Sequence, residues 1–158
     1  MHILLGADAN GFALKEELKA YLLTLGHTLA DVGVNNAHDS ALYPDIALSL
    51  ALRIQDGESD RGILVCGTGI GMAMTANKVP GVRAACCHDP YSAERARKSN
   101  NAQIITFGAQ IIAATLACQL LDHWLASEFQ GGRSLPKVKR MDEIDQHYRH
   151  NKAERDLP

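Results

Sequence analysis

The stretch ILVCGTGIG, residues 63–71, decides the fold class of this 158-residue chain. It begins with the apolar run Ile63–Cys66, which has the length and character of a strand buried on both faces. Three glycines follow the run at alternating positions, Gly67, Gly69 and Gly71, and a helical stretch comes after them. A buried strand that turns at glycines into a helix is typical of the strand–helix units of a parallel sheet.

The same alternation of short apolar runs and amphipathic helical stretches extends over the rest of the chain. The predicted strands are His2–Gly6, Thr28–Val32, Ile63–Cys66, Val82–Cys87 and Ile104–Phe107. The predicted helices are Phe12–Leu25, Asp45–Gln55, one that follows the glycines and ends at Lys78, Pro90–Lys98, Gln110–Ser127, and one from about Lys139 to Asn151. The sequence therefore predicts an α/β fold, a Rossmann-like three-layer αβα sandwich with a five-stranded parallel sheet and a C-terminal helix. We expect residues 1–150 to form one domain and residues 151–158 to be a frayed tail.

Composition and charge disfavour several classes of partner. The formal net charge is -2, so the chain lacks the basic surface that nucleic acids and anionic lipids require. We expect neither a membrane span nor a signal peptide, because the apolar runs are short and an aspartate follows the first of them. The four cysteines include no C-x-x-C pair, which is typical of a reduced, cytoplasmic protein. The seven histidines lack the i, i+4 spacing of a helical zinc site, so we expect no metal and no other cofactor.

The glycine-rich turn predicts a cradle for an anion. Glycines let the backbone turn tightly so that successive N–H groups point outward, and the N-terminus of the following helix adds partial positive charge. Such a cradle suits a phosphate or the oxyanion of an enediolate. Cys66 lies at its edge, where N–H dipoles would stabilise a thiolate and make it available as a base. The alternative is that Cys66 is a small core residue, as most free cysteines are.

Further candidates follow the first strand, a later helix and the long apolar helix, each with a plain structural alternative. In a parallel sheet the ligand crevice lies beyond the carboxyl ends of the strands, where Asp8 could bind substrate hydroxyls or cap the first helix. Asn100 could cap a helix, form a turn or bind a ligand. Arg133 follows two glycines and, with Lys137, could bind a phosphate or belong to a solvated basic run.

Taken together, these segments resemble the ribose-5-phosphate isomerase B family, which also includes the galactose-6-phosphate isomerase subunits. The resemblance extends from His2 to about Ile144. It rests on the segments Gly6–Gly11, Asp39–Pro44, Ile63–Ala85, His88–Arg97, Asn100–Ala102, Ile105–Gly108 and Gly131–Arg133. The stretch Lys98–Thr106 is similar to that of the D-erythrulose 4-phosphate isomerases, so the chain resembles these members of the family most.

The resemblance implies an aldose–ketose isomerase of sugar phosphates that transfers a proton through a cis-enediolate without a metal or an organic cofactor. It implies a homodimer, often paired into a tetramer, with each active site at the dimer interface. Cys66 would be the base, and Thr68 would assist proton movement between the oxygens. The matched binding positions are the backbone N–H groups from Gly67 through Gly69 to Gly71 for the oxyanion, Asp8, Tyr43 and Asn100 for the sugar, and Arg133 and Lys137 for the phosphate.

Three positions depart from the pattern of the ribose-specific members. Their histidines are replaced by Ala9 and Ser99, and an arginine soon after the glycine matched by Gly108 is replaced by Gln110. The histidine matched by Ser99 opens the furanose ring in those members, a step that requires an acid. A tetrose 4-phosphate cannot close a five-membered ring, because its O4 is esterified, so it needs no ring opener. The resemblance and this argument both favour D-erythrulose 4-phosphate as the substrate.

Two other functions stay open from the sequence. The chain could isomerise ribose 5-phosphate with a substitute for the ring-opening histidine. It could also be a catalytically silent subunit that binds a sugar phosphate, although the complete glycine-rich turn beside Cys66 argues against this.

Overall fold

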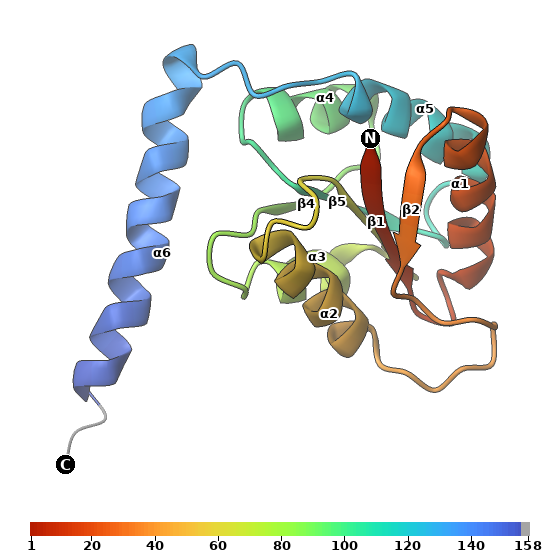
Figure 1. The fold of residues 1–158 in the computed structure, drawn as a ribbon, viewed down its shortest axis with the longest axis horizontal. Helices are drawn as coiled ribbons and strands as arrows, with labels where there is room; N and C mark the ends of the chain where they lie inside the picture. Colours follow the sequence, from red (N-terminus) through yellow and green to blue (C-terminus); the bar gives the residue numbers. More distant parts are fainter. Residues whose placement is uncertain (156–158) are drawn as a thin grey trace.

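The computed structural model describes the backbone of residues 1–155 and the side chains of residues 1–148. Strands and helices alternate along the chain, as the sequence predicts (Figure 1). The strands are β1 (His2–Ala7), β2 (Thr28–Asp31), β3 (Gly62–Cys66), β4 (Ala84–Cys86) and β5 (Ile104–Gly108). The helices are α1 (Phe12–Thr24), α2 (Tyr43–Gln55), α3 (Ile70–Ala76), α4 (Pro90–Lys98), α5 (Ala114–Leu125), the short 3-10 helix η1 (Gly132–Ser134) and α6 (Leu135–Arg155).

The five strands form one parallel sheet with the order β2-β1-β3-β5-β4. The chain moves outward from β1 to β2 and then returns to place β3 on the other side of β1, so the direction of winding reverses between β1 and β3. The loops that follow these two strands diverge at the reversal and leave a crevice at the carboxyl ends of the strands. The predicted sandwich with its five-stranded parallel sheet is confirmed. The candidate residues at the ends of β1 and β3 lie at this crevice.

Helices cover both faces of the sheet and make two apolar cores. Residues of α1, α4 and α5 pack on one face, and residues of α2 and α3 pack on the other. Successive residues of a strand point to opposite faces, so Val65 of β3 belongs to the first core and Cys66 to the second. Every residue of β3 and of β5 is buried by this arrangement, which explains why their sequences are nearly continuous apolar runs rather than alternating ones.

The loop between β5 and α5 differs from the prediction in a way that matters for function. The predicted helix over Gln110–Ser127 begins only at Ala114, because the backbone just before it is bonded to the glycine-rich turn. Ala109 N donates to Cys66 O at 2.8 Å, and Gln110 N donates to Gly67 O at 3.0 Å. These bonds hold the loop after β5 against the end of β3 and prevent Gln110 from starting the helix.

Other boundaries differ by smaller amounts. β4 starts later than predicted because Val82 N donates to Val79 O in a turn and Arg83 N donates to the side chain of Gln103. α6 is longer than predicted at both ends, and Pro136 in its first turn needs no intrahelical donor there. The fraying expected for residues 151–158 stays a prediction, since α6 continues to Arg155 and residues 156–158 lie outside the described part of the chain.

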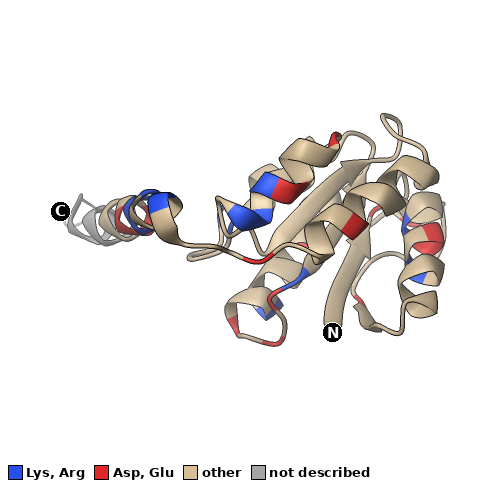
Figure 2. Cartoon of the chain, turned by 90° about the horizontal axis from the view of Figure 1, so that it is seen from above, with Lys and Arg blue, Asp and Glu red and all other residues tan. Residues whose placement is uncertain are grey.

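Helix α6 projects away from the body of the molecule, as Figure 2 shows. Asp142 accepts a hydrogen bond from Arg83 Nη1 at 2.8 Å, and Asp145 accepts one from Gly81 N at 3.0 Å, so α6 is attached to the turn before β4. Its exposed side chains include the large apolar residues Leu135, Met141, Ile144 and Tyr148. Among the helices that the structure describes, none is long and apolar enough to cross a membrane.

Candidate active site

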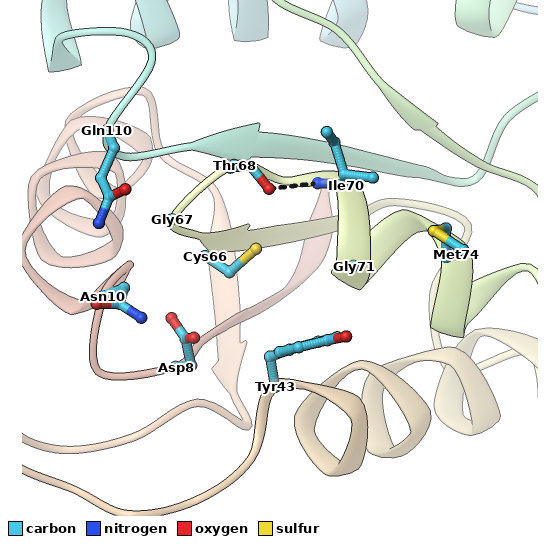
Figure 3. Close-up of a pocket in the computed structure, with 10 residues that line it drawn as sticks. All are labelled: Asp8, Asn10, Tyr43, Cys66, Gly67, Thr68, Ile70, Gly71, Met74 and Gln110. Atoms are coloured by element: carbon cyan, nitrogen blue, oxygen red, sulfur yellow. Dashed lines mark hydrogen bonds between the residues drawn. The ribbon is translucent and has the colours of Figure 1, made fainter.

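A pocket of about 430 Å³ lies where β1 and β3 end and the winding of the sheet reverses. This is the size of site that holds a small metabolite. Its lining consists of Asp8, Asn10, Tyr43, Cys66, Gly67, Thr68, Ile70, Gly71, Met74 and Gln110 (Figure 3). The fold therefore brings six of the predicted site residues together, namely Asp8, Tyr43, Cys66, Gly67, Thr68 and Gly71.

Cys66 ends β3 and is the thiol of the pocket. The residue is only 5% exposed, yet it lines the cavity between Asp8 and Thr68 (Figure 3). The backbone N–H of Gly69 donates to Cys66 Sγ at 3.2 Å. An N–H directed at the sulfur stabilises negative charge on it, as a thiolate base requires. Cys66 thus packs in the second core and also presents its sulfur to the pocket.

Gly69 has a backbone that only glycine adopts readily. Its φ is +78°, and a Cβ there would stand 2.8 Å from the carbonyl carbon of Phe107. This conformation directs the Gly69 N–H at the sulfur of Cys66 rather than at the cavity, and Gly69 does not line the pocket. Gly69 therefore contacts the candidate base in this structure, and its predicted contact with substrate stays a prediction.

Two further residues of the pocket are held by the turn after β3. The Thr68 hydroxyl accepts a hydrogen bond from Ile70 N at 3.4 Å, so its own proton stays available to a ligand. The ring of Tyr43 packs so closely over Gly71 that a Cβ on Gly71 would stand 2.6 Å from it. Glycine at position 71 therefore lets the first residue of α2 close one side of the pocket.

Asp8 follows β1 and is 8% exposed. Its Oδ1 accepts a hydrogen bond from Gly11 N at 2.9 Å, which closes the turn before α1. Helix α1 has no side-chain cap, so Asp8 stabilises the turn rather than capping the helix in the predicted way. The Asp8 side chain also lines the pocket (Figure 3), so its carboxylate is within reach of a ligand there.

The other cysteines differ from Cys66 because none of them lines the pocket. Burial raises the pKa of Cys86 and of Cys118, and it raises the pKa of Cys87 to about 12. These three side chains therefore stay protonated near neutral pH. The contrast singles out Cys66, whose sulfur accepts a backbone N–H and borders a ligand-sized cavity.

His88, two residues after β4, contacts the end of β5, where the loop that carries Gln110 begins. Its Nε2 accepts a hydrogen bond from Gly108 N at 2.9 Å, a role that only the neutral imidazole can take. Burial lowers the pKa of His88 and so favours this neutral form. This contact gives His88 a structural role, because it joins the segment after β4 to the end of β5.

Four lining residues had not been identified as site residues from the sequence: Asn10, Ile70, Met74 and Gln110. Ile70 and Met74 lie four residues apart on α3, a spacing that places both on one face of a helix. Asn10 and Gln110 follow β1 and β5, the two neighbours of β3 in the sheet. The strand order would have identified them, but strand order is not visible in the sequence.

Three predicted binding residues, Asn100, Arg133 and Lys137, are not brought to the pocket. Helix α4 starts after β4 and returns to the start of β5, so Asn100 lies at the amino edge of the sheet, opposite the pocket. Gln130 N donates to Lys98 O at 3.3 Å, which holds the segment before Arg133 near the same edge. A strand of five residues spans about 16 Å, so these residues and Cys66 do not border one cavity within a single chain.

The pocket is poor in positive charge. Among the described residues that line it, Asp8 is the only Asp or Glu, and there is no Lys, Arg or His. Within the described residues no group of three or more His, Cys, Asp or Glu side chains is placed to hold a metal ion. The arrangement offers a thiol as base, a hydroxyl that can donate and accept, and a carboxylate, which are the groups that proton transfer between neighbouring carbons requires.

Comparison with known proteins gives a consistent result. The family model for Ribose/Galactose Isomerase matches residues 3–141. The chain is 47% identical to a D-erythrulose-4-phosphate isomerase of Pectobacterium atrosepticum, over 95% of this chain and 99% of that protein. It is 53% identical to a Ribose-5-P isomerase B of Listeria innocua, over 92% of this chain and 98% of that protein. The structure of Clostridium thermocellum ribose-5-phosphate isomerase B superposes with a TM-score of 0.91 at 41% identity, covering 94% of this chain and 99% of the other. The chain therefore belongs to the ribose/galactose isomerase family.

Proposed function

We propose that this protein interconverts an aldose phosphate and a ketose phosphate, with Cys66 as the base. The observation that carries the proposal is the placement of the Cys66 sulfur, which accepts the Gly69 N–H at 3.2 Å and lines the same pocket as Thr68 and Asp8. A buried sulfur that accepts a backbone N–H beside a metabolite-sized cavity suits a base better than a core residue.

The reaction moves one proton between neighbouring carbons. The Cys66 thiolate takes the proton from the carbon next to the carbonyl, which leaves a cis-enediolate, and the thiol returns the proton to the other carbon. Thr68 moves the second proton between the two oxygens, so that the carbonyl and the hydroxyl exchange places. Backbone N–H groups of the turn, those of Gly67 and Gly71 among them, stabilise the oxyanion during the exchange, while the Gly69 N–H stays on the Cys66 sulfur. No net proton, electron or group is gained or lost.

Each active site is completed by a second copy of the chain. A sugar phosphate carries negative charge, but the described lining of the pocket has no basic side chain, whereas the predicted phosphate-binding Arg133 and Lys137 lie near the opposite edge of the sheet. A homodimer, or a dimer of dimers, can place these residues and Asn100 of one copy at the pocket of the other. Exposed apolar residues of α2, α3 and α6, including Leu48, Met74 and Ile144, offer surface for such an interface.

The substrate that the site fits best is D-erythrulose 4-phosphate, which isomerises to D-erythrose 4-phosphate. Ser99 and Ala9 stand where the ribose-specific pattern has histidines, and the Ser99 hydroxyl accepts a hydrogen bond from Arg95 Nε at 2.8 Å. Neither residue supplies an acid for ring opening, and a tetrose phosphate needs none. Because a thiolate base must stay reduced, we place the reaction in the cytoplasm.

Ribose 5-phosphate is the second candidate substrate. The 53% identity to the Listeria innocua Ribose-5-P isomerase B favours it. This alternative requires a ring-opening acid from elsewhere, or a ring that opens in solution before binding.

Replacing the sulfur tests the proposed base. Cys66→Ala should lower kcat by about 10²- to 10⁴-fold, the contribution of a positioned base, while thermal unfolding stays within a few degrees of wild type. Cys87→Ala is the matched control: Cys87 is another buried cysteine, outside the pocket, and its loss should leave kcat near the wild-type value. A Cys66→Ala protein that still isomerises sugar phosphates at the wild-type rate would contradict the proposal.

A further inference from the structure

The glycine-rich turn after β3 contains three glycines within five positions, Gly67, Gly69 and Gly71. The Gly69 N–H is directed at the Cys66 sulfur while Gly69 has a φ of +78°. Glycine adopts positive and negative φ about equally readily, so a turn this rich in glycine does not select one conformation by itself. Contacts from outside the turn must therefore hold Gly69 in the conformation that serves the base.

One such contact comes from Thr106 in β5. Thr106 is fully buried and is the polar residue of a strand, IITFG, that is otherwise apolar. Side chains alternate between the faces of a sheet, so Thr106 faces the same core as Ile104, the second core, to which Cys66 also belongs. The Thr106 hydroxyl donates a hydrogen bond to Gly69 O at 2.8 Å. This bond joins the middle glycine of the turn to a buried strand of the sheet.

The simplest alternative is that Thr106 is an ordinary strand residue, since β-branched side chains suit strands. Valine has the same shape, however, and avoids the cost of taking a hydroxyl out of water. The carbonyl of Gly69 does not depend on the hydroxyl for a donor either, because it also accepts a hydrogen bond from Ala73 N at 3.2 Å in α3. The Thr106 hydroxyl therefore fixes the position of Gly69 rather than supplying a donor that its carbonyl would otherwise lack.

The peptide group before Gly69 is held at both of its ends. Its N–H, from Gly69, donates to Cys66 Sγ at 3.2 Å. Its carbonyl, from Thr68, accepts from Cys86 Sγ at 3.7 Å. The turn also packs directly on the end of β5, where a Cβ on Gly69 would stand 2.8 Å from the carbonyl carbon of Phe107. Side chains and backbone of β4 and β5 thus set the direction in which the Gly69 N–H points.

We propose that Thr106 is a positioning residue for the base, because its hydroxyl holds Gly69 so that the Gly69 N–H stays directed at the Cys66 sulfur. The inference rests on the proposed function of Cys66 and adds to it a side chain that lies outside the pocket lining. Without the hydroxyl, the turn can rotate at its glycines and the N–H leaves the sulfur for part of the time. The thiolate then loses part of a charge-assisted hydrogen bond.

Thr106→Val tests the inference, because valine keeps the shape of the side chain and removes the hydroxyl. The measured quantities are kcat, KM and the rate at which iodoacetamide alkylates Cys66, followed by mass spectrometry. The alkylation rate at pH 7 and kcat should each fall by about 5- to 20-fold, less than the full value of a hydrogen bond to a charged group, while KM changes little. At pH 10 the alkylation rates of variant and wild type should converge, since cysteine thiols are ionised there even without a nearby donor.

A second variant and a matched control separate positioning from packing. Thr106→Ser keeps the hydroxyl and loses a buried methyl group, so it should unfold at a lower temperature than Thr106→Val and still keep both rates within about 2-fold of wild type. Thr75→Val is the matched control, because Thr75 also donates to a glycine carbonyl, Gly71 O at 2.9 Å, but from within α3. It should change neither rate. Alkylation of Cys118, which lies on α5 outside the pocket, should be equal in all variants.

The outcomes separate this inference from the function on which it rests. A Thr106→Val protein that keeps the wild-type alkylation rate would overturn the inference, and so would a Thr106→Ser protein whose rates fall as far as those of Thr106→Val. In either case the isomerase function stands. A wild-type protein that isomerises no sugar phosphate, but whose Cys66 alkylation depends on the Thr106 hydroxyl, would instead overturn the proposed function and leave the positioning of the sulfur in place.

Discussion

His88 is a residue whose protonation state affects a hydrogen bond that holds the fold. Its Nε2 accepts the Gly108 N–H at 2.9 Å, and Gly108 begins the loop whose next residues are bonded to the ends of Cys66 and Gly67. An imidazolium has no acceptor, so a proton on His88 would break this bond and loosen the loop that carries Gln110.

Stability should therefore fall as the pH is lowered through the range in which histidine titrates. Burial lowers the pKa of His88 in the folded protein, so the unfolded chain takes up a proton first, below about pH 6.5. The free energy of unfolding then decreases with falling pH until the folded state is protonated as well. Urea unfolding at pH 7.5 and 5.5 should show this decrease.

A variant assigns that pH dependence to His88. His88→Gln keeps an acceptor for the Gly108 N–H and does not titrate, so part of the decrease should disappear. The part that remains includes His27, whose pKa burial also lowers. An unchanged decrease in His88→Gln would mean that other groups control acid stability.

At the residue scale, the sequence predicted the side chains that follow apolar runs and missed those whose loops depend on tertiary contacts. Cys66 ends one predicted strand and Asp8 lies two residues after another, so their place at the carboxyl edge of the sheet could be inferred. Gln110 could not be identified, because its loop is shaped by hydrogen bonds to Cys66 O and Gly67 O, atoms more than forty positions away in the sequence. The helical pattern after β5 instead favoured starting α5 at Gln110.

At the element scale, a buried lysine joins α1 to the segment that leads to the pocket. Lys15 is fully buried, and its Nζ donates to Asp31 Oδ2 and to Val34 O, each at 2.8 Å. Burial alone would raise the pKa of Asp31, but the hydrogen bonds from Lys15 and Lys19 outweigh it and hold that pKa below its usual value. The end of β2 and the loop after it are thus fixed to α1.

Removing this cation should be costly. Lys15→Met should lower the free energy of unfolding by about 3 kcal/mol, because it leaves the largely buried Asp31 carboxylate without one of its donors. Lys19→Met is the control, since Lys19 also donates to Asp31 Oδ2, at 2.9 Å, from a side chain that is 36% exposed. Its loss should cost less than about 1 kcal/mol. Equal losses in chemical unfolding would show that burial does not decide the strength of these pairs.

The elements themselves were largely predictable because their apolar periodicity is strong. Five strands and six main helices lie where the patterns indicate them, and α4 has the predicted bounds. The strand order β2-β1-β3-β5-β4 was not available from these patterns, because they fix the type of each element and not its neighbours. That order is what joins the loops of β1, β3 and β5 in one pocket.

At the scale of the whole molecule, the predicted site residues lie at two opposite edges of the sheet. Asp8, Tyr43, Cys66 and Thr68 line the pocket, while Asn100, Arg133 and Lys137 lie away from it. Sequence resemblance gave both groups, but the structure of one chain unites only the first. We propose that the two groups of residues meet in a site shared between two copies of the chain.

Mixing two inactive variants tests the shared site. Cys66→Ala and Arg133→Ala should each lose most activity as homodimers. When the two chains are co-expressed in equal amounts, mixed dimers should contain one site with both residues intact, and about a quarter of the wild-type activity should return. No recovery, in a preparation shown to contain mixed dimers, would mean that Cys66 and Arg133 do not act in the same intersubunit site.

The most direct test of the account is a comparison of kcat/KM for D-erythrulose 4-phosphate and ribose 5-phosphate, measured on the wild-type protein in the presence of EDTA. The account predicts a clearly higher kcat/KM for D-erythrulose 4-phosphate than for ribose 5-phosphate, because Ala9 and Ser99 offer no acid for ring opening. A preference for ribose 5-phosphate would contradict the substrate assignment, and activity on neither sugar would contradict the function itself.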